Sequence, residues 1–313
     1  MGDYIHNKIL IRSPAKINLH LEVIGKREDD FHELSMIMQS IDLYDFLEFE
    51  INNNNDLNLN SACKDLSLNE DNLIIKAGLL LRDFSGNHRL GADIFLTKNI
   101  PIGAGLAGGS TNAAAALIGL NNLWKLNLDI KTLHKLAVQL GSDVPFCLNG
   151  GFQFCFGKGE VLQKYNLKNN YGLILIKNPN VTISTENIYK KYSLKFVKDN
   201  LLETKLINER RNFLRLYGFH NLKNGEKIAI RNDLQKIVEE ENESVRNGLK
   251  LLSQFDDSLC SSMSGSGPSC FSIFKSIEAA EKCHEKNKIN IREGGYESWV
   301  CKFVNKGVSI VSD

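Results

Sequence analysis

The sequence predicts an α+β protein of two domains, with the active site in the cleft between them. Its 313 residues are enough for about two domains, and either half is long enough to bury its own core. The chain closes with the order helix, strand, strand, helix, strand, which is typical of an α+β sandwich. We expect domains over residues 1–165 and 166–313, and ligand sites are common between domains.

The first predicted strand covers residues 9–23, where apolar and polar residues alternate after Pro14. A period of two predicts one apolar face and one polar face. The apolar face would carry Ile17, Leu19, Leu21 and Val23. The polar face would carry Lys16, Asn18, His20 and Glu22.

The remaining elements follow from hydrophobic periodicity and from helix start and stop signals. In the first domain we expect a strand at 35–51, a helix at about 72–84, a strand at 92–98, helices at 110–125 and 131–140, and a strand at 151–156. In the second domain we expect a strand at 173–177, helical stretches that include 233–255, two strands around a second glycine-rich loop, a helix at 277–287 and a strand at 298–304.

The most informative segment joins the strand at 92–98 to the helix at 110–125. It places four glycines within seven positions, directly before an alanine-rich helix. Glycine allows positive φ and close approach to a ligand, and a helix start offers unpaired N–H groups at the positive end of its dipole. Such a loop is suited to bind phosphate. Its candidate nucleotide-binding residues are Pro101, Ile102, Gly103, Ala104, Gly105, Leu106, Ala107, Gly108, Gly109, Ser110 and Thr111.

Two familiar nucleotide loops do not fit this segment. Gly103, Gly105 and Gly108 match the pattern G-x-G-x-x-G, but a dinucleotide fold also needs a second strand and an acidic residue about 20 positions later. Asp129 instead resembles the N-cap of a second helix. The spacing also matches a Walker A loop, but Gly109 stands where its lysine is required. A tight turn without a ligand remains an alternative, although so many glycines carry an entropic cost.

Lys16 and Asp143 are less specific when each is considered alone. The simplest interpretation of Lys16 is a lysine on the solvated side of a strand. The simplest interpretation of Asp143, in Gly-Ser-Asp-Val-Pro, is a turn residue that caps its own backbone. Only their combination with the glycine loop favours a functional role.

Four segments together resemble the GHMP small-molecule kinase superfamily. They are Pro-Ala-Lys-Ile-Asn at 14–18, Gly-Gly-Ser-Thr-Asn at 108–112, Gly-Ser-Asp-Val-Pro at 141–145 and a glycine-rich run at 264–271. They occur in the expected order and span most of the chain. The resemblance implies the two-domain GHMP kinase architecture and transfer of the γ-phosphoryl of ATP to an alcohol.

The resemblance also implies roles in that transfer, which depends on positioning and charge stabilisation. The loop from Gly103 to Thr111 would cradle the phosphates of ATP with its N–H groups. Asp143 would accept the hydroxyl proton, and Lys16 would keep Asp143 ionised and supply the cation missing from the loop. Mg²⁺ would be held mainly through the phosphates, so no protein metal ligands are predicted. Ala107 departs from the glycine usual in these kinases, which puts the fit of ATP in question.

Residues 25–34 are similar to those of superfamily members whose substrate is a methylerythritol linked to cytidine diphosphate, in the non-mevalonate isoprenoid pathway. That likeness implies phosphorylation of the 2-hydroxyl. Phe31 would stack on the cytosine and His32 would bond its edge, which suits a nucleobase. Without the resemblance, this segment would be a hairpin end with one buried aromatic. Further substrate-binding positions implied by the resemblance are Asn18, Lys98 and Thr185.

Two alternatives from other classes remain open. A non-catalytic sugar or nucleotide sensor on the same fold should have lost Lys16 or Asp143, and both are present. A kinase of homoserine or of a mevalonate derivative would have no base to stack on Phe31.

Composition excludes several other classes. The net charge is +1, which gives no indication of a nucleic-acid partner, and no apolar run is long enough to span a membrane. The seven cysteines show no metal or disulfide spacing, so we expect reduced core residues.

The N-terminus lacks the apolar core of a signal peptide, and we expect a cytoplasmic enzyme that is a monomer or weak homodimer. The charged segment 208–227 is expected to form a surface helix and loop.

Overall fold

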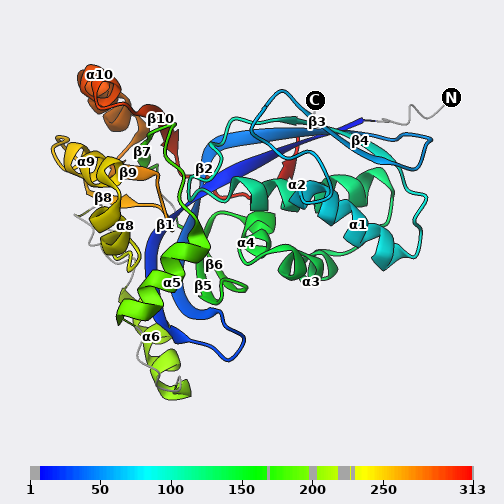
Figure 1. Cartoon of the computed structure of the whole chain (residues 1–313), viewed down its shortest axis with the longest axis horizontal. Coiled ribbons are helices and arrows are strands. Elements are labelled where there is room, and N and C mark those ends of the chain that lie inside the picture. Colours follow the sequence, from blue (N-terminus) through cyan, green and yellow to red (C-terminus); the bar gives the residue numbers. More distant parts are fainter. Residues whose placement is uncertain (1–7, 168–169, 197–202, 218–225, 227–229, 312–313) are drawn as a thin grey trace.

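The computed structural model describes residues 8–167, 170–196, 203–217, 226 and 230–311. The chain forms two sheets with helices packed against them (Figure 1). The elements of the first sheet and its helices are β1 (Lys8–Lys26), β2 (His32–Glu50), β3 (Leu57–Ser61), α1 (Leu73–Ser85), β4 (Ala92–Thr97), α2 (Gly108–Leu123), α3 (Ile130–Leu140), α4 (Val144–Asn149), β5 (Phe152–Gly157) and β6 (Val161–Tyr165). The later elements are β7 (Gly172–Lys177), α5 (Thr185–Phe196), α6 (Thr204–Tyr217), α8 (Gln235–Glu241), α9 (Glu243–Leu252), β8 (Cys260–Met263), β9 (Cys270–Phe274), α10 (Ile277–Glu293), β10 (Glu297–Lys302) and β11 (Ser309–Ile310).

The first sheet is organised around the long antiparallel pair of β1 and β2. Its order is β11-β1-β2-β4-β3 at one end, while the other half of β2 pairs with β5, and β5 with β6. The second sheet has the order β10-β7-β9-β8 and is antiparallel throughout. The last strand, β11, returns to the first sheet and pairs with β1.

A β-bulge in β1 corrects the predicted faces of that strand. Asn18 pairs with Met38 and Leu21 with Met36, so three residues on β1 match two on β2. Met36 and Met38 share one face of the sheet because they are two positions apart. Leu21 therefore lies on the same face as Asn18, and the prediction of one continuous apolar face was wrong. A simple period of two cannot reveal the extra residue of a bulge.

The α2 helix is the centre of the first helical layer. Its alanines are fully buried, and they let the helix lie close to the sheet. A Cβ added to Gly119 would meet the ring of Phe49 at 2.5 Å. Figure 1 shows α1 to α4 gathered on one side of the first sheet, with α8 to α10 beside the second sheet. This packing fixes the start of α2, where the glycine loop ends.

The two sheets share a hydrophobic core. Ile17 of β1, Leu175 of β7 and Phe271 of β9 belong to one cluster of buried side chains. Burial of apolar surface stabilises by roughly 25 cal/mol per Å², so this shared cluster joins the two halves of the molecule. The cavity described below lies where they meet.

The predicted elements agree with the structure at their centres, and the differences have local causes. The helix predicted at 233–255 is two helices, because the Asn242 side chain caps α9 by accepting from the N–H of Val245. The short elements β3, β6, α4 and β11 were not predicted. Of the charged segment 208–227, residues 208–217 lie in α6 as expected for a helix, and 218–225 and 227 lie outside the described residues.

All seven cysteines are free. Five are buried, as expected for core residues, whereas Cys63 and Cys260 are only partly buried. In the described part of the chain, no helix is both long and apolar enough to cross a membrane.

Candidate active site

One cavity of about 1120 Å³ lies between the two halves of the chain. Its walls come from β1, the β1–β2 turn and the glycine loop on one side, and from α5 and the second glycine loop on the other. Except for Thr111, every residue predicted to bind nucleotide or substrate, or to act in catalysis, lines this cavity. Thr111 is fully buried behind it, one turn into α2.

Lys16 and Asp143 meet at the cavity wall. Lys16 Nζ lies 3.4 Å from Asp143 Oδ2 and donates to Asn18 Oδ1 over 2.7 Å. The Lys16 side chain is 6% exposed, while that of Asp143 is 30% exposed. A nearly buried ammonium is therefore held against a carboxylate that still reaches the cavity.

Asp143 does not cap its own backbone. It occupies the N-cap position of α4 but its side chain makes no capping hydrogen bond. Pro145 sits within the first turn of α4, where its missing N–H is tolerated. The carboxylate is consequently available to Lys16 and to the cavity. The simplest interpretation of this residue from sequence, a self-capping turn, is wrong.

The glycine loop takes the left-handed conformations expected of it. Gly103 and Gly105 have φ of 60° and 73°, and Ala107 has φ of 56° at the N-cap of α2. A non-glycine residue in this region costs about 1–2 kcal/mol, so the loop tolerates strain at Ala107. The first N–H groups of α2 remain without partners in the helix and mark a site for an anion. The N–H of Lys16 bonds to the carbonyl of Leu106 over 3.1 Å, which ties the loop to β1.

The second glycine loop supports the first. The hydroxyl of Ser264 donates to the carbonyl of Gly105 over 3.0 Å. A Cβ on Gly105 would lie 2.3 Å from the carbonyl oxygen of Ser264, so only glycine fits there. The hydroxyl of Ser266, in the same loop, lies 2.7 Å from the hydroxyl of Thr185, the first residue of α5. Thr185 thus joins this loop to the start of α5.

Phe31 and His32 form the end of the cavity at the β1–β2 turn. Phe31 is 49% exposed, with Lys158 Nζ 4.3 Å from the centroid of its ring. The His32 ring stacks on Tyr189 with centroids 5.2 Å apart, and its Nε2 contacts the hydroxyl of Ser193. Burial, together with Lys26, lowers the pKa of His32 below its usual 6.5. A neutral imidazole stacked on Tyr189 can donate a hydrogen bond to a planar ligand or accept one from it.

Lys98 lies beneath the loop in a buried ion pair. Its Nζ donates to Asp45 Oδ2 over 2.6 Å and to the carbonyl of Ile100. Asp45 is fully buried and also accepts the N–H groups of Asn99 and Ile100. This cluster fixes the segment that leads into the glycine loop. A Cβ added to Gly108 would lie 2.9 Å from Lys98 Nζ. Its ammonium group therefore faces the loop as well as Asp45.

Several cavity residues were missed by the sequence analysis. Tyr189, Lys158 and Ser266 line the cavity near the predicted site, and Leu66 and Asn72 line it near the glycine loop. Tyr189 and Asn72 had no recognisable signal, because their place depends on how α5 and α1 pack. Ser266 lay within a recognised glycine-rich motif and could have been included.

Two family models match the chain. The model of the GHMP kinases N terminal domain matches residues 72–151, and that of the GHMP kinases C terminal matches residues 219–292. The first match contains the glycine loop and Asp143, and the second contains the loop at 264–267. These matches confirm the resemblance on which the predicted architecture depended.

Two proteins of Prochlorococcus marinus are similar to this chain over nearly its whole length. A protein of Prochlorococcus marinus (strain MIT 9515) called 4-diphosphocytidyl-2-C-methyl-D-erythritol kinase is 56% identical, over 97% of this chain and 98% of its own. One of the same name from strain NATL2A is 46% identical, over 96% and 95%.

Solved structures show the same fold. A crystal structure of 4-(cytidine 5'-diphospho)-2C-methyl-D-erythritol kinase has a TM-score of 0.72 at 26% identity, over 95% of this chain and 98% of that chain. A homoserine kinase from Cytophaga hutchinsonii has a TM-score of 0.71 at 18% identity, over 99% of both. The second likeness concerns the fold alone. The predicted α+β fold class is confirmed.

Proposed function

The chain belongs to the GHMP kinases, and we propose that it uses ATP to phosphorylate the 2-hydroxyl of 4-diphosphocytidyl-2-C-methyl-D-erythritol, giving the 2-phosphate and ADP. This reaction is a step of the non-mevalonate route to isoprenoid precursors. The observation that carries the proposal is a single cavity that holds the Lys16–Asp143 pair, the glycine loop and the Phe31–His32 pair. A phosphate site, a reaction centre and a nucleobase site are the three parts that this reaction needs.

The glycine loop fits the phosphates of ATP. Its positive φ angles at Gly103 and Gly105 turn the chain tightly, and the unpaired N–H groups at the start of α2 are suited to an anion. Backbone N–H groups from Gly103 to Ser110 would hold the phosphates, and the Ser110 hydroxyl lines the same wall. ATP supplies the phosphoryl group when bound. Ala107 already has the left-handed conformation that a glycine would adopt there, so the alanine keeps the turn of the loop.

Mg²⁺ would be held mainly through the phosphates of ATP. This ion keeps several waters and is usually bound through one or two carboxylates together with substrate phosphates. The residues present fit such an ion, because the Asp143 carboxylate and the Ser110 hydroxyl both offer oxygen atoms at the cavity wall. Mg²⁺ would offset negative charge on the phosphates when bound.

Asp143 and Lys16 would form the reaction centre. Asp143 accepts the proton of the 2-hydroxyl as that oxygen forms its bond to the γ-phosphorus and the bond to the leaving ADP breaks. A positioned base contributes about 10²–10⁴ in rate. Lys16 pairs with Asp143 and offsets the charge that develops near the acceptor oxygen. Asn18 holds the ammonium group of Lys16 in place through its amide oxygen.

The other end of the cavity would bind the cytidine diphosphate moiety. Phe31 offers an exposed ring for stacking, and base–aromatic stacking is worth about 1–3 kcal/mol. His32, held by Tyr189 and Ser193, would bond the edge of the base. Thr185 and Lys98 remain substrate-binding candidates, with Lys98 reaching the cavity only beside its ion pair with Asp45.

The wider setting belongs to the same proposal. We place the domain boundary at residues 165 and 166, supported by the two sheets, which separate between β6 and β7 except for the returning β11. Seven free cysteines favour a reducing compartment such as the cytoplasm. We keep a monomer or weak homodimer as the working assembly.

An acceptor panel tests the function. The purified chain with Mg-ATP should release ADP with 4-diphosphocytidyl-2-C-methyl-D-erythritol and show negligible release with homoserine or mevalonate. Turnover of homoserine or mevalonate at a comparable kcat/KM would contradict the assignment. ATP binding without turnover of any acceptor would favour a sensor.

A further inference from the structure

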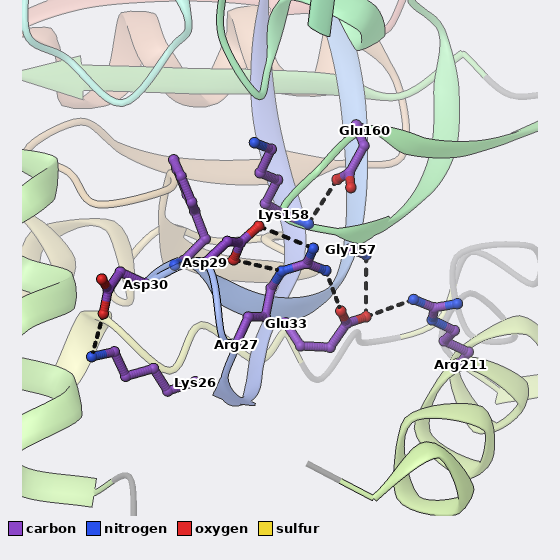
Figure 2. A network of polar contacts seen from close by, with 10 residues as sticks. Lys26, Arg27, Asp29, Asp30, Glu33, Gly157, Lys158, Glu160 and Arg211 are labelled. Atoms are coloured by element: carbon purple, nitrogen blue, oxygen red, sulfur yellow. Dashed lines mark hydrogen bonds and ion pairs between the residues drawn. The ribbon is translucent and has the colours of Figure 1, made fainter. Parts of the chain in front are cut away.

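The residue that follows His32 is a buried carboxylate at the centre of a network. Glu33 has a side chain only 4% exposed. It accepts from Arg27 Nη1 over 3.0 Å, from Arg211 Nη2 over 2.6 Å and from the N–H of Gly157 over 3.2 Å (Figure 2). A carboxylate this buried is stable only when it is fully paired. Three segments that are far apart in sequence are therefore fixed at one point.

The network continues to the backbone of Phe31. Arg27 donates through Nε and Nη2 to the two oxygens of Asp29, over 3.0 and 3.1 Å. Asp29 Oδ1 in turn accepts the N–H of Phe31 over 3.3 Å. The N–H of Arg27 also bonds to the carbonyl of Phe31 over 2.8 Å. Any shift of Glu33 is thus transmitted to the turn that carries Phe31 and His32.

The bond from Gly157 places a second part of the same pocket. Gly157 ends β5 with φ of 70°, and the next residue is Lys158. The N–H of Lys158 is held by Glu160 Oε2 over 2.7 Å (Figure 2). The Nζ of Lys158 lies over the ring of Phe31. Glu33 therefore fixes both the ring and the cation that lies against it.

Arg211 is the member of the network that comes from outside the first sheet. It lies on α6, which packs near the hairpin end of β2 (Figure 1). Its side chain is 23% exposed, and its guanidinium also lies 5.3 Å from the centroid of the Phe156 ring. Without Arg211, one oxygen of the buried Glu33 would lose its charged partner, and the remaining partners are Arg27 and Gly157.

We propose that Arg211 is a positioning residue for the nucleobase pocket, which it holds in shape through Glu33. This rests on the proposed function, because it assigns the pocket at Phe31 and His32 to the cytidine moiety. Arg211 does not line the cavity and has no role at the glycine loop. It therefore acts on binding of the cytidine-linked substrate and leaves the phosphoryl-transfer step unaffected.

The chain offers a matched control on the same helix. Arg215 lies one turn further along α6, with its guanidinium 4.8 Å from the centroid of the same Phe156 ring. It donates to Gln163 and Asn212, and no hydrogen bond or ion pair joins it to Glu33 in the described part of the chain. Arg211→Gln and Arg215→Gln thus remove the same charge and the same ring contact, but only Arg211→Gln removes the bond to Glu33, while Arg215→Gln removes bonds to Gln163 and Asn212.

Steady-state kinetics of the two variants test the proposal. Arg211→Gln should raise the KM for 4-diphosphocytidyl-2-C-methyl-D-erythritol about tenfold, the effect of losing one charged hydrogen bond. Its kcat and its KM for ATP should change less than about twofold, within the range of ordinary surface substitutions. Arg215→Gln should match the wild type. Equal KM values in the two variants, or a fall in kcat without a change in KM, would overturn the proposal.

A double-mutant cycle tests the route through Glu33. Glu33→Gln alone should raise the same KM, and adding Arg211→Gln to it should have little further effect, because the two changes act through one contact. Independent, multiplying effects would refute the route. Circular dichroism melting curves identify a variant that fails to fold, and Arg211→Lys, which retains the charge, then serves as the test with partial recovery of KM expected. A wild type inactive on this acceptor would instead refute the proposed function.

Discussion

The ammonium group of Lys16, at the middle of β1, lies 3.4 Å from the carboxylate of Asp143, at the start of α4. The two residues are far apart in the chain and meet because α4 follows the helices that pack on the first sheet. The backbone N–H of Lys16 also bonds to Leu106 of the glycine loop. A cation, a carboxylate and a phosphate-binding turn therefore occupy one site.

Removal of the cation should slow the chemical step. We expect Lys16→Met to lower kcat by about 10²–10³, the effect of losing one preorganised electrostatic group. The KM for the cytidine-linked acceptor should change much less, because Lys16 lies away from the nucleobase pocket. Initial-rate measurements over both substrate concentrations check this. An unchanged kcat would show that the cation acts elsewhere.

Removal of the exposed Phe31 ring at the β1–β2 turn should weaken binding of the acceptor and not of ATP. Phe31→Ala should raise the KM for the acceptor about tenfold, since base–aromatic stacking is worth about 1–3 kcal/mol. The KM for ATP should stay within about twofold. Leu194→Ala, a highly exposed residue at the cavity rim, is a control for loss of apolar surface. A larger effect on ATP would place Phe31 outside the nucleobase pocket.

Acid should weaken acceptor binding through His32. Burial and Lys26 lower its pKa below 6.5, so the neutral form is present at pH 7. As pH falls below 6.5 and through the lowered pKa, the ring gains a proton and loses its acceptor nitrogen. The unfolded chain binds that proton more readily, so His32 also makes the folded state less stable over this range.

A pH profile of the acceptor KM is the measurement. KM should be constant above pH 6.5 and rise below it in the wild type, whereas His32→Asn should have a higher KM without that rise. The same acid rise in both proteins would assign it to another group. A change at the reaction centre can be separated from this effect, because it would appear in kcat and not in the acceptor KM.

The contact between the two glycine loops should make Gly105 sensitive to a single methyl group. At Gly105 a Cβ would lie 2.3 Å from the Ser264 carbonyl oxygen and require an alanine at φ of 73°. We expect Gly105→Ala to lower the free energy of unfolding by at least about 2 kcal/mol. Gly109→Ala is the control, because its Cβ would meet only Leu73, at 3.8 Å. Urea denaturation compares the two, and equal stabilities would contradict the packing.

The sequence was sufficient for the parts of the site that depend on short motifs. The glycine loop precedes α2 as predicted, because four glycines before an alanine run leave few other local structures. Asn18 and His32 were predicted from the resemblance to GHMP kinases, on motifs that also contain Lys16 and Phe31. These residues reached the cavity because each lies on or beside a strand whose pairing is strongly specified.

Other parts of the site depend on tertiary packing that no local pattern reveals. The bulge after Asn18 turned Leu21 toward the cavity, and periodicity alone did not predict it. Tyr189 stacks on His32 only because α5 lies across the turn. Arg211 belongs to a charged segment that we predicted to form a surface helix and loop. Its partner Glu33 is buried by elements that are far away in sequence. Long-range ion pairs of this kind follow from the fold.

The most direct test of the reaction centre is the single-turnover rate of Asp143→Asn with saturating Mg-ATP and 4-diphosphocytidyl-2-C-methyl-D-erythritol. Asparagine keeps the shape of the side chain but removes the charge beside Lys16 and the group that accepts the proton. We predict a rate lower by about 10²–10⁴, with the Kd for ATP retained. A rate close to that of the wild type would contradict the central role of the Lys16–Asp143 pair.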